Sequence, residues 1–135
     1  MCKPDMTIDA SAAKTDETFQ QWSKCIQDLS SFDNVYMKLS GGFSELSKFR
    51  VFASDPKDLV GMMRPWLECV FESFGPGQIM FGSDWPVCNV RGPAVEKSWT
   101  VWTDTVKCAM DDFDLSEAQK VRVWKETAIE AYRLR

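Results

Sequence analysis

The feature that most constrains the fold is a pair of short apolar segments separated by a long helical stretch. Residues 35–40 and 78–84 each have the length and apolar content of a β-strand. Between them, Ser54-Asp55-Pro56 predicts a helix start and Gly75-Pro76-Gly77 predicts its end. Strands joined by a helical crossover of this length pair in parallel, because antiparallel neighbours need only a tight turn. The sequence therefore predicts an α/β fold with parallel strands and intervening helices.

The other helices are predicted from apolar residues spaced three and four positions apart. A helix over residues 15–29 would bury Phe19, Trp22, Ile26 and Leu29. A second apolar stripe comprises Val95, Trp99, Trp102, Val106 and Met110. A capping box at Ser116 and Gln119 predicts the start of the last helix. That helix would bury Val121, Trp124, Ala128 and Tyr132. Pro65 lies inside the crossover helix and predicts a kink or a division into two helices.

The composition excludes several classes of function. The chain has 135 residues, a formal net charge of −4 and no histidine. It therefore has no basic footprint for a nucleic-acid backbone, and it cannot form a Ser-His-Asp triad or an imidazole metal site from its own residues. The length suits one domain or one piece of a domain over residues 1–135.

The five cysteines include no CxxC pair and are predicted to be free thiols: Cys2, Cys25, Cys69, Cys88 and Cys108. Cys2 and Cys88 have no histidine partner, so idle thiols are expected rather than a cysteine nucleophile. No secretory signal or membrane-spanning run is found in the sequence. These features predict a cytoplasmic protein that binds neither membrane nor nucleic acid.

Asp84 is the main candidate for chemistry. In parallel α/β folds the ligand site lies at the carboxyl ends of the strands, and Asp84 ends the second one. There a carboxylate can serve as a general base or as a metal ligand. The alternative is that Asp84 caps the following turn, and the residue types alone favour neither role.

Four other residues are candidates for substrate binding: Lys38, Trp85, Asn89 and Arg91. Lys38 would neutralise an anion, Trp85 would stack on a ring, and Asn89 with Arg91 would hydrogen-bond a carboxylate. The alternatives are a structural ion pair or a protective edge charge for Lys38, and solvated loop residues for Asn89 and Arg91. Trp99 and Trp102 are expected in the core.

Several motifs together resemble the C-terminal part of the amidohydrolase-related family, which includes sugar-acid and pyrone-dicarboxylate lactonases. They are Cys2-Lys3-Pro4, residues 34–41, Phe74-Gly75-Pro76, residues 80–86 with Gly-Ser-Asp-Trp-Pro, and the closing Thr127-Ala128 and Tyr132-Arg133-Leu134. The resemblance implies a TIM-type (β/α)8 barrel, with residues 35–40 and 79–84 as its seventh and eighth strands. It also implies that Asp84 is the catalytic carboxylate and that the complete protein uses a divalent metal such as zinc.

The resemblance also identifies what this chain lacks. Family members carry an N-terminal His-x-His strand and a further histidine just before the segment that Met1-Cys2-Lys3-Pro4 matches. A complete barrel needs about 250 residues, so we expect Met1 to be an internal methionine of a longer protein. The 135 residues alone support no cofactor, and a metal role for Asp84 would need histidines from elsewhere.

Two functions follow from these observations. In the first, the chain belongs to a hydrolase in which Asp84 activates water to open a small-molecule lactone. In the second, it is a catalytically inert fragment or pseudoenzyme whose open sheet edges lead it to self-associate.

Overall fold

The computed structural model describes residues 3–46 and 55–135, and their sheet has two parallel strands. Strand β1 (Met37–Leu39) pairs with β2 (Ile79–Phe81), with Lys38 opposite Met80 in the register. Helix α5 (Pro56–Phe74) lies between them in the chain. The parallel pairing and the helical crossover are therefore confirmed. Both strands are shorter than predicted because the pairing extends over only three positions on each strand.

Helix α5 begins and ends as its sequence predicts. The side chain of Asp55 accepts a hydrogen bond from the Asp58 N–H at 3.0 Å, and the helix ends at Gly75, whose φ is +65°. Ser54 lies outside the described residues. The helix continues through Pro65, so the division into two helices does not occur. Pro65 cannot donate to the carbonyl of Gly61, but Gly61 is exposed and has open space around it.

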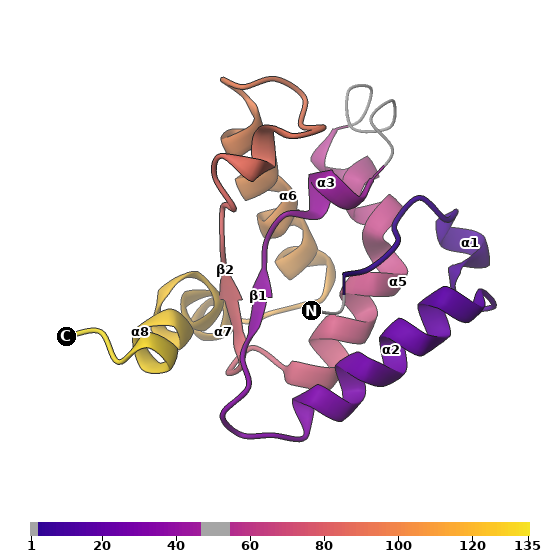
Figure 1. The fold of residues 1–135 in the computed structure, drawn as a ribbon. Helices are drawn as coiled ribbons and strands as arrows, with labels where there is room; N and C mark the ends of the chain where they lie inside the picture. Colours follow the sequence, from indigo (N-terminus) through magenta and orange to yellow (C-terminus); the bar gives the residue numbers. More distant parts are fainter. Residues whose placement is uncertain (1–2, 47–54) are drawn as a thin grey trace.

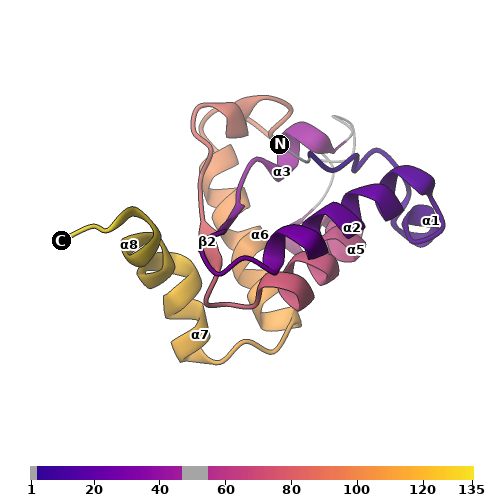
Figure 2. The ribbon, with the colours of Figure 1, turned by 60° about the horizontal axis from the view of Figure 1, so that its bottom comes forward.

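The helices are arranged around α5 and the sheet (Figures 1 and 2). Helix α2 (Glu17–Ser30) packs along one side of α5, and α6 (Ser98–Asp112) packs against it as well. The C-terminal elements α7 (Glu117–Val121), η2 (Arg122–Glu126) and α8 (Thr127–Tyr132) lie beside β2. The shorter elements are α1 (Ala10–Ala13), α3 (Gly42–Glu45) and the 3-10 turn η1 (Val87–Asn89).

The main core lies between α2, α5, α6 and one face of the sheet. The predicted stripe of α2 is buried at Phe19, Trp22 and Ile26, and the ring of Phe19 contacts Trp66 of α5 edge-on at 5.6 Å between ring centroids. Leu29 was expected in this stripe but is 37% exposed, because it lies in the last turn of the helix. The core therefore ends about one turn earlier on α2 than the spacing predicts.

The buried stripe predicted for the last helix is found only in part. Trp124 and Ala128 are half-buried, and Trp124 packs against the core. Val121 and Tyr132 are exposed, and the buried positions are instead Val123 and Thr127. The reason is η2, which is a π-helical turn. A wider turn breaks the 3.6-residue periodicity on which the predicted stripe depends. The capping box at the start of α7 is confirmed, with the two side-chain bonds of Ser116 and Gln119 at 3.3 and 2.8 Å.

The stripe predicted for α6 is only partly buried. Trp102 is buried at 2% exposure, whereas Trp99 is 51% exposed and Val95 is 74% exposed. Val95 precedes the helix, which begins at Ser98, and Trp99 lies in its first turn. The expectation of a core position holds for Trp102 and fails for Trp99. Within residues 3–46 and 55–135, no helix has the length and apolar character needed to cross a membrane.

Candidate functional site

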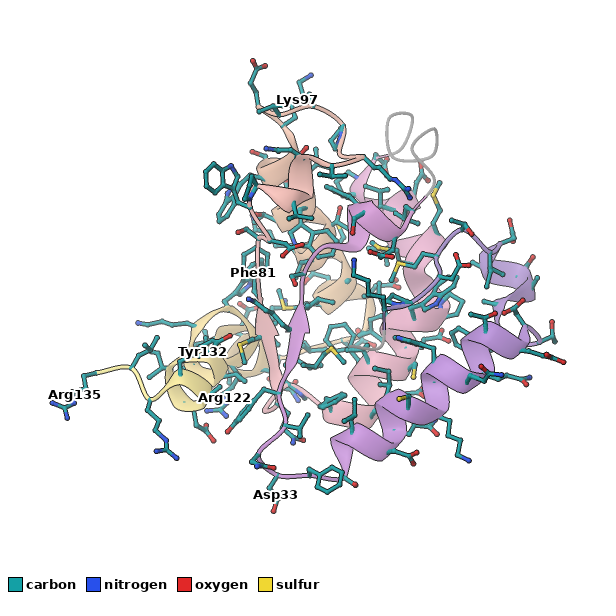
Figure 3. All side chains as sticks on the ribbon, in the orientation of Figure 1. Asp33, Phe81, Lys97, Arg122, Tyr132 and Arg135 are labelled. Carbon is teal, nitrogen blue, oxygen red and sulfur yellow. The ribbon has the colours of Figure 1, made fainter. Side chains whose placement is uncertain are left out.

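The candidate site lies where the loops leave β1 and β2. Because the strands are parallel, their carboxyl ends lie at the same edge of the sheet, and Gly41 and Asp84 follow there. In Figure 3 the labelled residue Lys97 marks the long loop after β2, and Asp33 marks the turn before β1 at the opposite end of the molecule. The predicted site residues after β2 therefore lie on the side of the sheet where parallel α/β proteins bind ligands.

Asp84 is half-buried and has a left-handed backbone conformation with φ at +56°. Its main-chain carbonyl accepts a hydrogen bond from the Cys88 N–H at 3.0 Å, which begins η1. The N-cap residue of this turn is Pro86, two residues after Asp84. The Oδ2 atom of Asp84 lies only 2.7 Å from where a Cβ would stand on Gly41. The carboxylate thus lies between the two strand ends rather than on a helix terminus.

Lys38 extends toward the same edge of the sheet. Its backbone pairs with Met80, but its Cε lies 2.9 Å from the position of a Cβ on Gly82, which directly follows β2. The aliphatic part of the side chain therefore runs along the sheet in the direction of Asp84. Among the described residues Lys38 forms no ion pair, so the structural ion pair considered from the sequence is not found there.

The other candidate residues follow Asp84 on the same loop. Trp85 is 70% exposed, and its N–H donates to Ser83 Oγ at 3.2 Å. Asn89 is half-buried within η1. Arg91 is exposed, and its Nη1 donates to the carbonyl of Ser44 on α3 at 3.1 Å. Arg91 therefore links the loop after β2 to the loop after β1 while its remaining donors stay available.

The Cys88 thiol lies beneath this loop. It is buried, and burial together with the nearby charge of Asp84 raises the pKa of the thiol. A raised pKa keeps the sulfur protonated near neutral pH, which agrees with the expectation of an idle thiol. Cys2, the other cysteine weighed as a nucleophile, lies outside the described residues.

Trp102 supports both strand ends, a role that was not predicted from the sequence. Its indole N–H donates to the carbonyl of Gly82 at 2.9 Å, and its ring contacts Phe43 edge-on at 5.3 Å between centroids. Gly42 allows this packing, because a Cβ there would lie 2.8 Å from the indole ring. The spacing of Trp102 identifies a buried residue, but the helical pattern contains no information about its polar partner.

The part of the chain that the structure describes does not form a metal site by itself. No three cysteine, aspartate or glutamate side chains gather there closely enough to hold an ion, and the sequence has no histidine. Asp84 is the single carboxylate at the strand ends that was predicted as a ligand, and one carboxylate is too few for the usual tetrahedral zinc site.

Comparison with known proteins identifies the family. The family model described as "Amidohydrolase" matches residues 6–134. The chain is 28% identical over 135 residues to an L-rhamnono-gamma-lactonase of Scheffersomyces stipitis, covering 99% of this chain and 39% of that protein. It is 30% identical over 124 residues to an L-fucono-1,5-lactonase of Burkholderia multivorans, covering 90% of this chain and 38% of that protein. The chain belongs to the amidohydrolase family.

A solved structure supports the same relationship. The crystal structure of an amidohydrolase from Burkholderia multivorans with bound zinc superimposes with a TM-score of 0.73 at 28% identity, covering 98% of this chain and 42% of that one. The α/β arrangement described above therefore matches part of an amidohydrolase fold. The chain spans about two-fifths of the length of the relatives that it matches.

Proposed function

We propose that residues 1–135 are the C-terminal part of a (β/α)8-barrel hydrolase that opens sugar-acid lactones. The observation that carries the proposal is the placement of the Asp84 carboxylate at the carboxyl end of a parallel strand, between the two strand-end loops. Two lactonases among the relatives support the substrate class. Barrel enzymes carry out their chemistry at this end of the strands.

In the proposed reaction Asp84 acts as a general base. Its carboxylate takes a proton from a water molecule as the oxygen of that water attacks the lactone carbonyl. The tetrahedral intermediate then expels the ring oxygen, which takes up the proton, and the product is an open hydroxy acid. Each step conserves atoms and charge without any oxidant or reductant.

The neighbouring side chains have separate binding roles in this proposal. Lys38 would place its positive charge near the developing oxyanion and the product carboxylate, and Arg91 would hydrogen-bond the same groups with its remaining N–H donors. Trp85 would stack on the apolar face of the sugar, and Asn89 would hydrogen-bond a hydroxyl. These residues are exposed or half-buried, and they lie on one strand and on the loop that follows the other strand.

A divalent metal in this site would need further ligands from outside the residues that the structure describes. Zinc is bound in the matching crystal structure, and Asp84 would contribute one carboxylate if the complete protein also held a metal. The described residues do not supply the other ligands. The chain's own contribution is a base, a nearby cation and a sugar-binding loop.

The proposal is tested with Asp84→Asn in a full-length version that contains the upstream histidines. The substitution keeps the shape of the side chain but removes the base, so turnover of L-rhamnono- and L-fucono-lactones should fall by about 10²- to 10⁴-fold with a smaller change in KM. Asp33→Asn, at the opposite end of the molecule, is the matched control. Full turnover by Asp84→Asn would disprove the assignment.

The second candidate function is a catalytically inert chain that associates through its sheet edges. The Met37 N–H donates to Gln78 and the Gly82 N–H donates to Leu39, at 2.7 and 3.1 Å. Successive residues of a strand direct their backbone groups to opposite sides, so those of Lys38 face away from β2. In the described sheet each strand has one neighbour, which leaves an edge on either side.

Sedimentation and activity of the 135-residue chain alone test the second candidate. We expect concentration-dependent association and no lactone hydrolysis above background, because unpaired strand edges recruit other strands. A monodisperse monomer with a sharp unfolding transition would contradict the association. Hydrolysis by the short chain that Asp84→Asn leaves unaltered would contradict both the need for a longer protein and the role of Asp84.

A further inference from the structure

Gly41 lies opposite the Asp84 side chain across the two strand-end loops. A Cβ on Gly41 would stand 2.7 Å from Oδ2 and 3.5 Å from Cγ of Asp84. The first distance is shorter than the van der Waals contact of carbon and oxygen, so the two groups could not occupy these positions together. The place now filled by the carboxylate therefore exists because residue 41 has no side chain.

The backbones on both sides of this contact are held by hydrogen bonds. The carbonyl of Gly41 accepts bonds from the N–H of Ser44 at 3.1 Å and from its Oγ at 2.8 Å. The carbonyl of Asp84 accepts the Cys88 N–H, and Arg91 bonds to Ser44 across the two loops. If residue 41 gained a methyl group, the side chain of Asp84 would be the part most free to move.

We infer that Gly41 is a positioning residue that fixes where the carboxylate of Asp84 stands. The inference deepens the proposed function, since it assigns a residue that acts through the proposed base. Its left-handed φ of +68° alone does not distinguish Gly41, because Gly75 has a φ of +65° as well. The difference is that a Cβ on Gly75 would meet nothing within 4 Å. Residue 41 is therefore constrained twice, by its positive φ and by the closeness of its Cβ position to the Asp84 carboxylate.

A double-mutant cycle on the full-length version isolates the steric part. Gly41→Ala is introduced into the parent sequence and into the Asp84→Gly variant. Urea unfolding then gives the folding equilibrium constant of each protein. Alanine at a left-handed position is unfavourable in both backgrounds, but the clash exists only when the carboxylate is present. The carboxylate must then turn away from residue 41, so we expect Gly41→Ala to reduce the folding equilibrium constant about two- to tenfold more in the parent sequence than in Asp84→Gly.

Gly75→Ala is the matched control for this cycle. The φ of Gly75 is also positive and unfavourable for alanine, although its ψ of 170° differs from the 14° of Gly41, and a Cβ there would meet nothing within 4 Å, so its effect should be equal in the two backgrounds. An equal effect of Gly41→Ala in both backgrounds would overturn the inference. A coupling that is just as large for Gly75→Ala would overturn it too, because the coupling would then not arise from the contact.

A spectroscopic measurement on the folded protein tests the inference and does not require an unfolding transition. The side-chain carboxyl carbon of Asp84 is observed by NMR in ¹³C-labelled protein and assigned by its loss in Asp84→Asn. Gly41→Ala should shift this signal, whereas Gly75→Ala should leave it unchanged. An unmoved Asp84 signal in Gly41→Ala would overturn the positioning role. Neither measurement uses lactone turnover, so a failure of the proposed activity is distinguished from a failure of this inference.

Discussion

The amino ends and the carboxyl ends of the two strands are held in different ways. At the amino end, the Gln78 side chain donates to the carbonyls of Phe32 and Val35 at 3.2 and 3.1 Å, and Arg122 donates to the carbonyl of Gly77 at 3.3 Å. These side-chain bonds satisfy backbone carbonyls that strand pairing leaves without a partner. Arg122 and Tyr132 lie near this end in Figure 3.

At the carboxyl end, three residues have left-handed backbone conformations and several polar groups remain accessible. Gly41, Asp84 and Arg91 have φ values of +68°, +56° and +64°. Such conformations are unfavourable for residues other than glycine and persist where the surrounding loops fix them. The hydrogen bonds at the amino end therefore stabilise the fold. The carboxyl end instead holds side chains in defined positions, at some cost in stability.

The largest expected effect on stability is at the amino end of β2. Ile79 is fully buried, so Ile79→Ala removes apolar contacts and leaves a cavity. We expect the free energy of unfolding to fall by about 2 to 5 kcal/mol. Urea unfolding of the full-length version, followed by tryptophan fluorescence, measures the change. A loss below about 1 kcal/mol would mean that the core between β2 and the helices is not packed as described.

A smaller loss is expected from Thr127→Val. The Thr127 hydroxyl is buried and donates to the carbonyls of Pro76 and Gly77 at 3.3 and 3.5 Å. Valine keeps the volume but leaves these carbonyls without the donor, which should cost about 1 to 2 kcal/mol in the same unfolding assay. Thr127→Ser, which keeps the hydroxyl, is the matched control and should retain the bond. Equal losses for both variants would indicate that methyl packing, not the hydrogen bond, stabilises this end.

Asp84→Gly should change stability little, in contrast to the loss of activity that the proposed function implies. Glycine relieves the left-handed strain at φ +56° but gives the unfolded chain more freedom, and the two effects are of similar size. We expect a change within about 0.5 kcal/mol in urea unfolding. A loss of 2 kcal/mol or more would show that the Asp84 side chain stabilises the fold and would remove the contrast between the two ends.

The smallest effect concerns pH. Arg122 donates to Glu130 at 2.8 Å and holds the pKa of that carboxyl below its ordinary value of 4.5, with a further contribution from Tyr36. A lowered pKa in the folded state means that the stabilisation is present above about pH 4.5 and is lost as the pH falls through the lowered folded value. The urea midpoint should therefore fall less between pH 7 and pH 3 in Arg122→Gln than in the parent chain. Identical pH profiles would exclude this contribution.

The sequence allowed the fold to be predicted where one local pattern decides the outcome. The cap at Asp55, the stop at Gly75 and the apolar face between them identified the crossover helix, and a long crossover implies parallel strands. The position of Asp84 at a strand end followed from the same reasoning. Each of these inferences depends on neighbours in the chain, so a linear pattern contains the information that is needed.

Other features depend on contacts between distant segments and could not be predicted. The contact of Gly41 with Asp84 requires the register between β1 and β2, which no local pattern specifies. The exposure of Trp99 depends on where α6 begins relative to the preceding loop. Spacing alone does not identify the bond from Trp102 to the Gly82 carbonyl either, since it marks the indole only as apolar.

The π-helical turn η2 also has a consequence for sequence comparison. A π turn contains about one residue more than an α-helical turn, so the helix after it is rotated by about 100° relative to a regular continuation. Val121 lies before η2 and Thr127 lies after it. The pattern of buried and exposed positions is therefore offset by one residue between the two sides. An alignment with a relative whose helix is regular needs a one-residue gap between them. Such a gap would mark a real change of helix geometry, and closing it would place exposed residues opposite buried ones.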